Sequence, residues 1–178
     1  MTALRISCLL ILTIFCSCAP KDTQEVVVYV AHDEMYSRPI LDDFTKKTGV
    51  AVRASYDTEA SKTTGIANRL AAEQGRPRAD VFWNNEVAQT IVLAQKGVLQ
   101  PYRSPAADAI PEEFKDANGA WTGFAARARV IIFNTNLVTE PPKSLRDFAK
   151  PEWKGKLAIA KPLFGTTASH AACLFAHW

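Results

Sequence analysis

The sequence predicts an α/β fold built around a mostly parallel sheet. Three short apolar runs recur along the chain, at Val26–Val30, Val50–Ala54 and Asp80–Trp83. A segment with helical spacing follows each run, and only a few residues connect one element to the next. Strands that alternate with helices over short connections are typical of β-α-β units, in which the strands run parallel.

The first β-α unit is the clearest. Val26–Val30 is a continuous run rich in valine, which favours a strand buried on both faces. A helix is predicted over Met35–Lys47, with Ile40 and Phe44 on its apolar face and Gly49 as its end.

Two further helices are predicted, over Lys62–Gln74 and Glu86–Lys96. Ile66 and Leu70 face inward on the first of them, and Gly97 closes the second. In open α/β sheets, ligands bind beyond the carboxyl ends of the strands. The polar residues at those ends are therefore candidate ligand-binding residues; they are His32, Asp33, Thr58, Asn85 and Glu86.

The second half of the chain changes character after residue 100. Residues 100–120 contain three prolines and predict a surface connection, and 125–134 form a long extended segment. A short helix with an N-cap pair is predicted at 144–147, a strand at 157–160 and a last helix running to Trp178.

The last helix opens with Gly165, Thr166 and Thr167. Backbone N–H groups and two hydroxyls at a helix start form a site suited to an anion, and ordinary capping threonines are the alternative. Arg127 and Arg129 lie two residues apart on the extended segment and share a face. They fit either an anionic ligand or a bridge between two parts of the protein.

Residues 1–18 have the pattern of a secretory signal: one basic residue, a short apolar run and small residues at the end. Cys18 at its end suggests a lipoprotein-type signal, with Cys18 as the lipidated residue; ordinary cleavage near Ala19 is the alternative. Only Cys173 lies well inside the remaining chain, so no internal disulfide framework is expected.

Composition excludes several classes of protein. The chain has 178 residues, 48% hydrophobic and 22% charged, which is ordinary for a globular protein. Its net charge of +3 argues against a nucleic-acid partner attracted by charge. The short motifs of hydrolases, zinc proteases and phosphate loops are absent from the sequence, which argues against an enzyme. A secreted enzyme and the ligand-sensing domain of a regulator remain alternatives.

Several segments together resemble the bacterial extracellular solute-binding proteins of ABC importers, and most closely their ferric-iron-binding branch. The resemblance covers nearly all of residues 25–178. The segments that carry it are Val26–Tyr29, Phe44–Val50, Ala79–Glu86, Gly97–Leu99, Trp121–Gly123, Arg127–Thr135, Pro141–Leu145 and Trp153–Lys156.

The resemblance implies a two-lobed clamshell of the periplasmic-binding-protein kind. Lobe one would span 25–124 and be complete except for its return strands, 125–134 would be the hinge, and 135–178 would be the incomplete start of lobe two. Ligand would bind in the cleft and stabilise the closed form. Family members are roughly twice as long as this chain.

The resemblance also implies a cargo, which is ferric iron held with a synergistic anion such as carbonate or phosphate. His32 and Glu86 are the candidate metal ligands, although gap-free counting places the family positions on Asp33 and Asn85. For Glu86 the alternative is a carboxylate that favours a helix start. The branch uses two adjacent tyrosines as further ligands, and the 178 residues contain no such pair. The candidate anion-binding residues are Asp33, Thr58, Asn85, Arg127, Gly165, Thr166 and Thr167.

The implied partner is an ABC permease in the inner membrane, and the implied location is the periplasm or the outer face of the cytoplasmic membrane. A lipid on Cys18 would hold the protein there. A transport role for another small ligand, such as a phosphonate or a polyamine, is the alternative to iron.

Overall fold

Three parallel strands form one sheet, in the order β2-β1-β3, in the computed structural model, which describes residues 24–57, 63–163 and 165–178. β1 spans Glu25–Val30, β2 spans Ala51–Tyr56 and β3 spans Val81–Trp83. β1 lies in the middle and pairs with β2 over its whole length and with β3 over its last three residues. The predicted α/β fold with a parallel sheet is confirmed.

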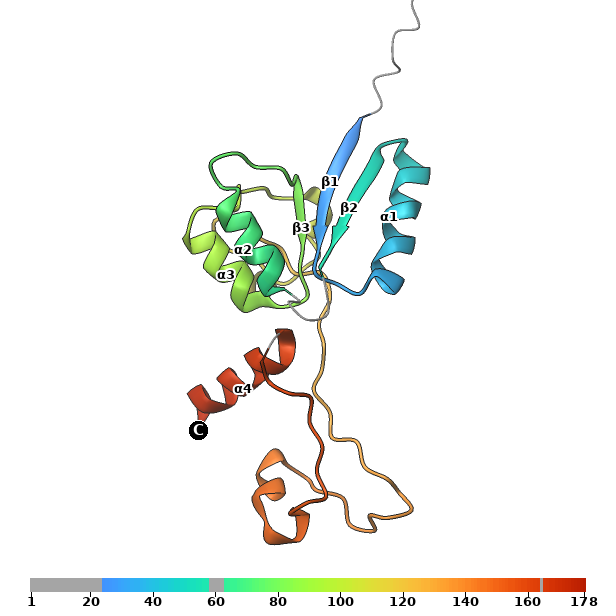
Figure 1. Cartoon of the computed structure of the whole chain (residues 1–178), viewed down its shortest axis with the longest axis vertical. Coiled ribbons are helices and arrows are strands. Elements are labelled where there is room, and N and C mark those ends of the chain that lie inside the picture. The colour runs from blue at the N-terminus through green and yellow to red at the C-terminus, as the bar shows by residue number, and fades with distance from the viewer. Residues whose placement is uncertain (1–23, 58–62, 164) are drawn as a thin grey trace, which may run out of the picture.

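Helices cover both faces of the sheet. α1 (Glu34–Thr48) lies on one side, whereas α2 (Thr64–Ala72) and α3 (Val87–Gln95) lie together on the other (Figure 1). The chain changes sides because β2 and β3 flank β1 on opposite edges. With the right-handed crossovers that are the rule between parallel strands, this order places successive helices on opposite faces. α4 (Gly165–His177) lies apart from the sheet. In the part of the chain that the structure describes, every helix is too short or too polar to span a bilayer.

The core lies between β1 and α2. Tyr29 is 1% exposed and packs with Ala31 and Ile66. The Tyr29 hydroxyl donates a hydrogen bond of 2.9 Å to Glu73, and the Arg69 guanidinium lies 4.2 Å from the centre of the Tyr29 ring. The buried phenol is therefore satisfied by charged groups at the end of α2.

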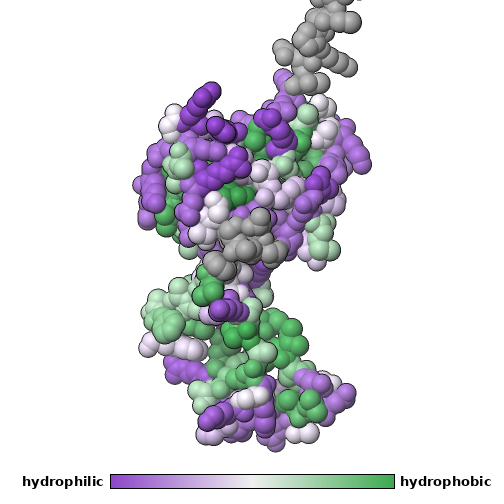
Figure 2. All heavy atoms as spheres, viewed as in Figure 1, coloured by the Kyte–Doolittle hydropathy of each residue, from purple (hydrophilic) through white to green (hydrophobic). Residues whose placement is uncertain are grey.

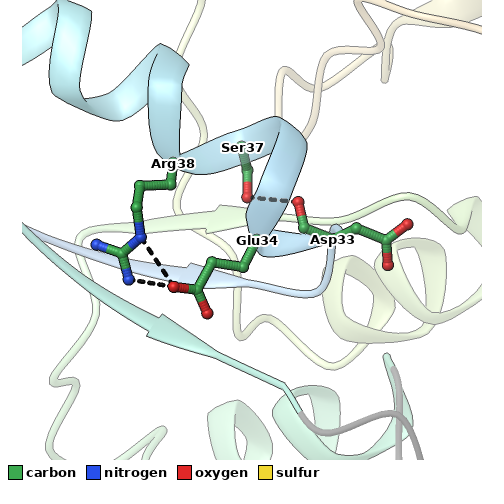
Figure 3. Close-up of polar contacts among 4 residues, drawn as sticks. All are labelled: Asp33, Glu34, Ser37 and Arg38. Atoms are coloured by element: carbon green, nitrogen blue, oxygen red, sulfur yellow. Dashed lines mark hydrogen bonds and ion pairs between the residues drawn. The ribbon is translucent and has the colours of Figure 1, made fainter.

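The start of α1 is held by local polar contacts (Figure 3). Ser37 is fully buried, and its hydroxyl donates a hydrogen bond of 3.0 Å to the carbonyl of Asp33. One turn along, Arg38 pairs with Glu34, the acidic residue in the first turn. These contacts stabilise the first turn of α1.

Helix α1 ends at Gly49, as predicted. The apolar face of the same helix is only partly covered. Gly49 adopts φ 74°, and its N–H donates to the carbonyl of Thr45, which closes the helix. Ile40 is 57% exposed and Phe44 is 42% exposed. Because α1 packs beside the edge strand β2, the described residues supply no further layer over this face.

The predicted strand at 157–160 is absent, and the extended segment 125–134 likewise forms no strand among the described residues. A strand needs a neighbour for its backbone hydrogen bonds, and neither segment has one there. Val130 and Ile132 are 71% and 88% exposed. Figure 1 shows the two segments as long connections, and Figure 2 shows apolar surface in the half of the molecule that holds them.

The predicted N-cap pair at residue 144 is confirmed. Ser144 and Asp147 form a capping box at the start of the 3₁₀ helix Leu145–Ala149. The Asp147 carboxylate accepts the N–H groups of Lys143 and Ser144 at 2.9 Å and lies 2.8 Å from the Lys150 ammonium. The Lys150 contact and then the two backbone N–H groups lower the pKa of Asp147 to about 2.

This lowered pKa predicts a local pH dependence. Because the folded pKa lies below the unfolded value of ~3.9, the turn is stabilised above that value, and the stabilisation is lost as the pH falls toward 2. Amide exchange at Lys143 and Ser144, measured by NMR from about pH 5 to about pH 2, should accelerate over the lower part of this range beyond its intrinsic pH trend. In Asp147→Asn the extra acceleration should vanish; its persistence would contradict the assignment.

Candidate ligand site at the ends of the parallel strands

The candidate site begins where β1 and β3 end side by side. The N–H of Ala31 donates to the carbonyl of Trp83 at 2.9 Å, which extends the β1–β3 ladder one residue past β1. His32 follows β1, and its ring centre lies 5.7 Å from that of Trp83. The strand order reverses at this point of the sheet, which is the position where open α/β folds bind ligands.

Four aromatic rings form a row across this edge. His32 is stacked on Tyr36 with ring centres 6.0 Å apart, and it also contacts Trp83. Phe124 meets Trp83 edge to face with ring centres 5.7 Å apart. Residues from α1, β3, the connection after β1 and the segment after residue 120 therefore meet in one wall of the site.

Arg127 joins the extended segment to this wall. Its guanidinium Nη2 lies 3.2 Å from His32 Nδ1, although 95 positions separate the two residues in the sequence. Two residues further on, Arg129 donates from Nη2 to the hydroxyls of Thr166 and Thr167, at 2.8 and 3.3 Å. The two arginines thus contact different partners, one at the sheet and one on α4.

Glu86 is the residue that caps α3. It is 7% exposed, and its two carboxylate oxygens accept the N–H groups of Ala88 and Gln89, at 2.6 and 2.9 Å. The helix-start role that the sequence offered for Glu86 is therefore confirmed. Its Oε1 also accepts a hydrogen bond of 2.6 Å from the Ser169 hydroxyl on α4. Metal ligation by Glu86 stays a prediction.

The residues beside Glu86 hold the loop between β3 and α3. Asn84 Oδ1 accepts the N–H groups of Asn85 and Glu86. Asn85 Oδ1 accepts a hydrogen bond of 3.3 Å from the hydroxyl of Thr63, which is buried and adopts φ 71° at the start of α2. A β-branched residue with positive φ is uncommon, and here the surrounding contacts hold it in place.

The predicted site residues thus fall into two groups. His32, Asp33, Asn85 and Glu86 gather at the ends of β1 and β3, and Arg127 reaches this group through His32. Gly165, Thr166 and Thr167 open α4, where Arg129 contacts both hydroxyls. Thr58 and Cys18 lie outside the described residues. The described residues contain no group of three or more His, Cys, Asp or Glu side chains placed to hold a metal ion.

Sequence reasoning missed Ser169 and the pairing of Phe124 with Trp83. Ser169 lies 83 positions from Glu86, and a serine inside a helical pattern gives no sign of a distant acceptor. Arg129 was recognised as a candidate for an anion, but its contact with the two threonines depends on how α4 lies.

A hollow of about 560 Å³ lies elsewhere, around residues 139–153. Pro141, Pro142 and Trp153 line it together with charged side chains. Asp147 and Lys150 in its wall are paired with each other, so their charges are largely neutralised within the wall. The strand-end site is the better candidate because polar groups from separate parts of the chain converge there.

Comparison with known proteins matches the chain to a family and to several relatives. Residues 79–176 match the family described as bacterial extracellular solute-binding protein. The chain is 31% identical to an Fe(3+)-binding periplasmic protein of Serratia marcescens over 77% of its own length and 40% of that protein's. It is 28% identical to iron uptake protein A1 of a Synechocystis strain, over 79% of its own length and 38% of the relative's.

A solved structure of similar fold is the apo ferric ion-binding protein A of Pasteurella haemolytica. The TM-score is 0.76 at 28% identity, over 87% of this chain and 48% of that one. The likeness confirms the predicted periplasmic-binding-protein fold. The chain spans less than half the length of each of these relatives.

The capping contacts of Glu86 predict a measurable loss of stability. Glu86→Ala removes the acceptor for two N–H groups of α3, and it should lower the free energy of unfolding by about 1–2 kcal/mol, the usual cost of losing an N-cap. Ser169→Ala removes the contact between Glu86 and α4, and a local bond of 3.2 Å to the Gly165 carbonyl. It leaves the α3 cap in place, so its effect should be smaller. Urea denaturation followed by circular dichroism measures both, and equal losses would contradict the capping role.

Proposed function

Because the chain belongs to the family of bacterial extracellular solute-binding proteins, we propose that it captures ferric iron for an ABC importer. The iron would be held together with a small anion, carbonate or phosphate, and delivered to a permease in the inner membrane. The names of the relatives, which include an Fe(3+)-binding periplasmic protein and an iron uptake protein, support iron as the cargo.

One observation carries the proposal: polar side chains from distant parts of the chain meet at the strand ends. Glu86 accepts from Ser169, and Arg127 contacts His32, so the sheet is tied both to α4 and to the extended segment. A ligand between these parts would be contacted from both sides, and such contacts favour the closed form of a clamshell. We propose 25–124 as lobe one, 125–134 as the hinge and 135–178 as the start of lobe two.

The candidate site residues form two chemical groups, one suited to the metal and one suited to the anion. His32 and Glu86, with Asp33 as the alternative to His32, supply the nitrogen and oxygen atoms that ferric iron accepts. The start of α4 supplies donors: the hydroxyls of Thr166 and Thr167 and the backbone N–H groups of the first turn, with Arg129 beside them. A carbonate or phosphate at this position would contribute oxygen atoms of its own to the metal.

The direct test is a titration of the complete gene product with ferric iron in the presence of carbonate or phosphate. We expect binding accompanied by a visible charge-transfer band. Arg129→Ala should weaken binding of the anion by about ten- to a hundredfold, because a hydrogen bond from a charged donor contributes about 1.5–3 kcal/mol. A flat calorimetric trace with ferric citrate, together with clear heat from a phosphonate or a polyamine, would select the alternative cargo. Catalytic turnover of a small substrate would contradict a transport role.

We also propose that the protein works in the periplasm or on the outer face of the cytoplasmic membrane, with a lipid on Cys18 as its anchor. A diacylglycerol thioether with an added acyl chain gives stable anchoring, since a single chain binds membranes only marginally. Metabolic labelling with palmitate should mark the wild type and leave Cys18→Ser unlabelled. Equal labelling of both proteins, or none of either, would contradict the anchor.

A further inference from the structure

The row of four aromatic rings at the strand ends is only partly covered. Tyr36 and Phe124, at the two ends of the row, are 57% and 68% exposed. His32 and Trp83, between them, are half-buried. A single exposed aromatic side chain is ordinary, but these rings come from separate parts of the chain and meet at the position where open α/β folds bind ligands. An exposed apolar surface at such a position marks a binding surface.

The rings do not form a closed stack. The angle between neighbouring ring planes is 23° for His32 and Tyr36, 38° for His32 and Trp83, and 63° for Trp83 and Phe124. Together with the exposure of both end rings, these angles leave ring surface uncovered along the row. Aromatic surfaces attract a further flat ring through offset stacking or edge-to-face contact, so the row is suited to a planar aromatic ligand.

The charges beside the row favour a ligand that is also an anion. The guanidinium of Arg127 is exposed and lies 3.2 Å from the His32 ring, so a positive charge stands at the row. Arg129, two positions further on, adds a second positive charge on the same segment. A guanidinium binds a carboxylate through strong, charge-assisted hydrogen bonds. Binding sites of this kind combine apolar and aromatic walls with a few polar groups that orient the ligand.

The row also adjoins the candidate metal ligands. His32 belongs to the row, and Asp33 is the next residue in the chain. Iron held at either residue would therefore lie beside the rings, and a chelator bound to that iron would lie against them. Ferric iron is a hard cation that prefers oxygen donors. A catechol presents two adjacent oxygen atoms at the edge of a flat ring, so it can hold iron by its edge and stack by its face.

We infer that the ring row is a stacking subsite that receives the iron as a complex with an aromatic chelator, a catechol that carries a carboxylate. The inference rests on the proposed function and names the class of complex in which the iron arrives. The rings contact the chelator's ring, and Arg127 contacts its carboxylate. An aliphatic chelator offers the same kind of oxygen atoms to iron and gains nothing from the rings.

The test compares two ferric complexes by calorimetry with the complete gene product: ferric protocatechuate, whose chelator is a catechol carboxylate, and ferric citrate, whose chelator is aliphatic. Phe124→Leu and Tyr36→Leu keep an apolar side chain and remove the ring, and both positions are exposed, so little packing is lost. Each variant should lose about tenfold more affinity for ferric protocatechuate than for ferric citrate, the upper end of what an aromatic pair contributes. Tyr102→Leu is the matched control, because Tyr102 is 71% exposed and lies outside the row, and it should bind both complexes as the wild type does.

A second measurement observes the stacking directly. Gallium(III) replaces ferric iron in the protocatechuate complex, since it has the same charge and a similar size and leaves the NMR signals sharp. We expect nuclear Overhauser contacts between the ring protons of protocatechuate and the ring protons of Phe124 and Tyr36. The protein signals are assigned from their loss in Phe124→Leu and Tyr36→Leu.

The outcomes distinguish the inference from the proposed function. If the protein binds ferric citrate, and either the leucine variants lose equal affinity for both complexes or the ring contacts are absent, the stacking subsite is overturned and the proposed function stands. If metal-free protocatechuate binds as tightly as its ferric complex, the stacking role stands and iron is contradicted as the cargo. If the wild type binds neither ferric complex, the proposed function fails and the inference fails with it.

Discussion

The pairing of β1 on both of its edges is the constraint from which the candidate site follows. Because β1 bonds to β2 along its length and to β3 at its carboxyl end, the chain must leave β1 and β3 at the same edge of the sheet. The contact between Ala31 and Trp83 continues this ladder, and it sets His32 against the Trp83 ring. The positions of His32 and Trp83 in the site therefore follow from that ladder.

Competition for lone pairs governs the chemistry of the site. The Glu86 carboxylate is shared among two N–H groups of α3 and the Ser169 hydroxyl, while His32 Nδ1 accepts from Arg127. The side chains proposed as ligands are thus also the side chains that join the parts of the protein. A ligand that took over these lone pairs would have to replace those contacts, and its binding would then be linked to conformation.

Arginine suits this arrangement better than lysine would. Its planar donor fork reaches an imidazole, a pair of hydroxyls or an oxyanion without changing its own charge. Arg127 and Arg129, two residues apart, reach opposite sides of the site from one extended segment. Through these two side chains the segment contacts both the end of the sheet, at His32, and the start of α4.

The sequence alone determined the elements: the three parallel strands, the helices between them, the end of α1 at Gly49 and the cap pair Ser144–Asp147 all follow from local patterns. It also located the strand ends that hold His32 and Glu86. Tertiary structure decided the rest. A strand pattern at 157–160 remained unpaired, since a strand exists only with a neighbour. The partners of Glu86 and His32, Ser169 and Arg127, lie 83 and 95 positions away, and hydrogen bonds over such separations depend on folding, which local spacing does not encode.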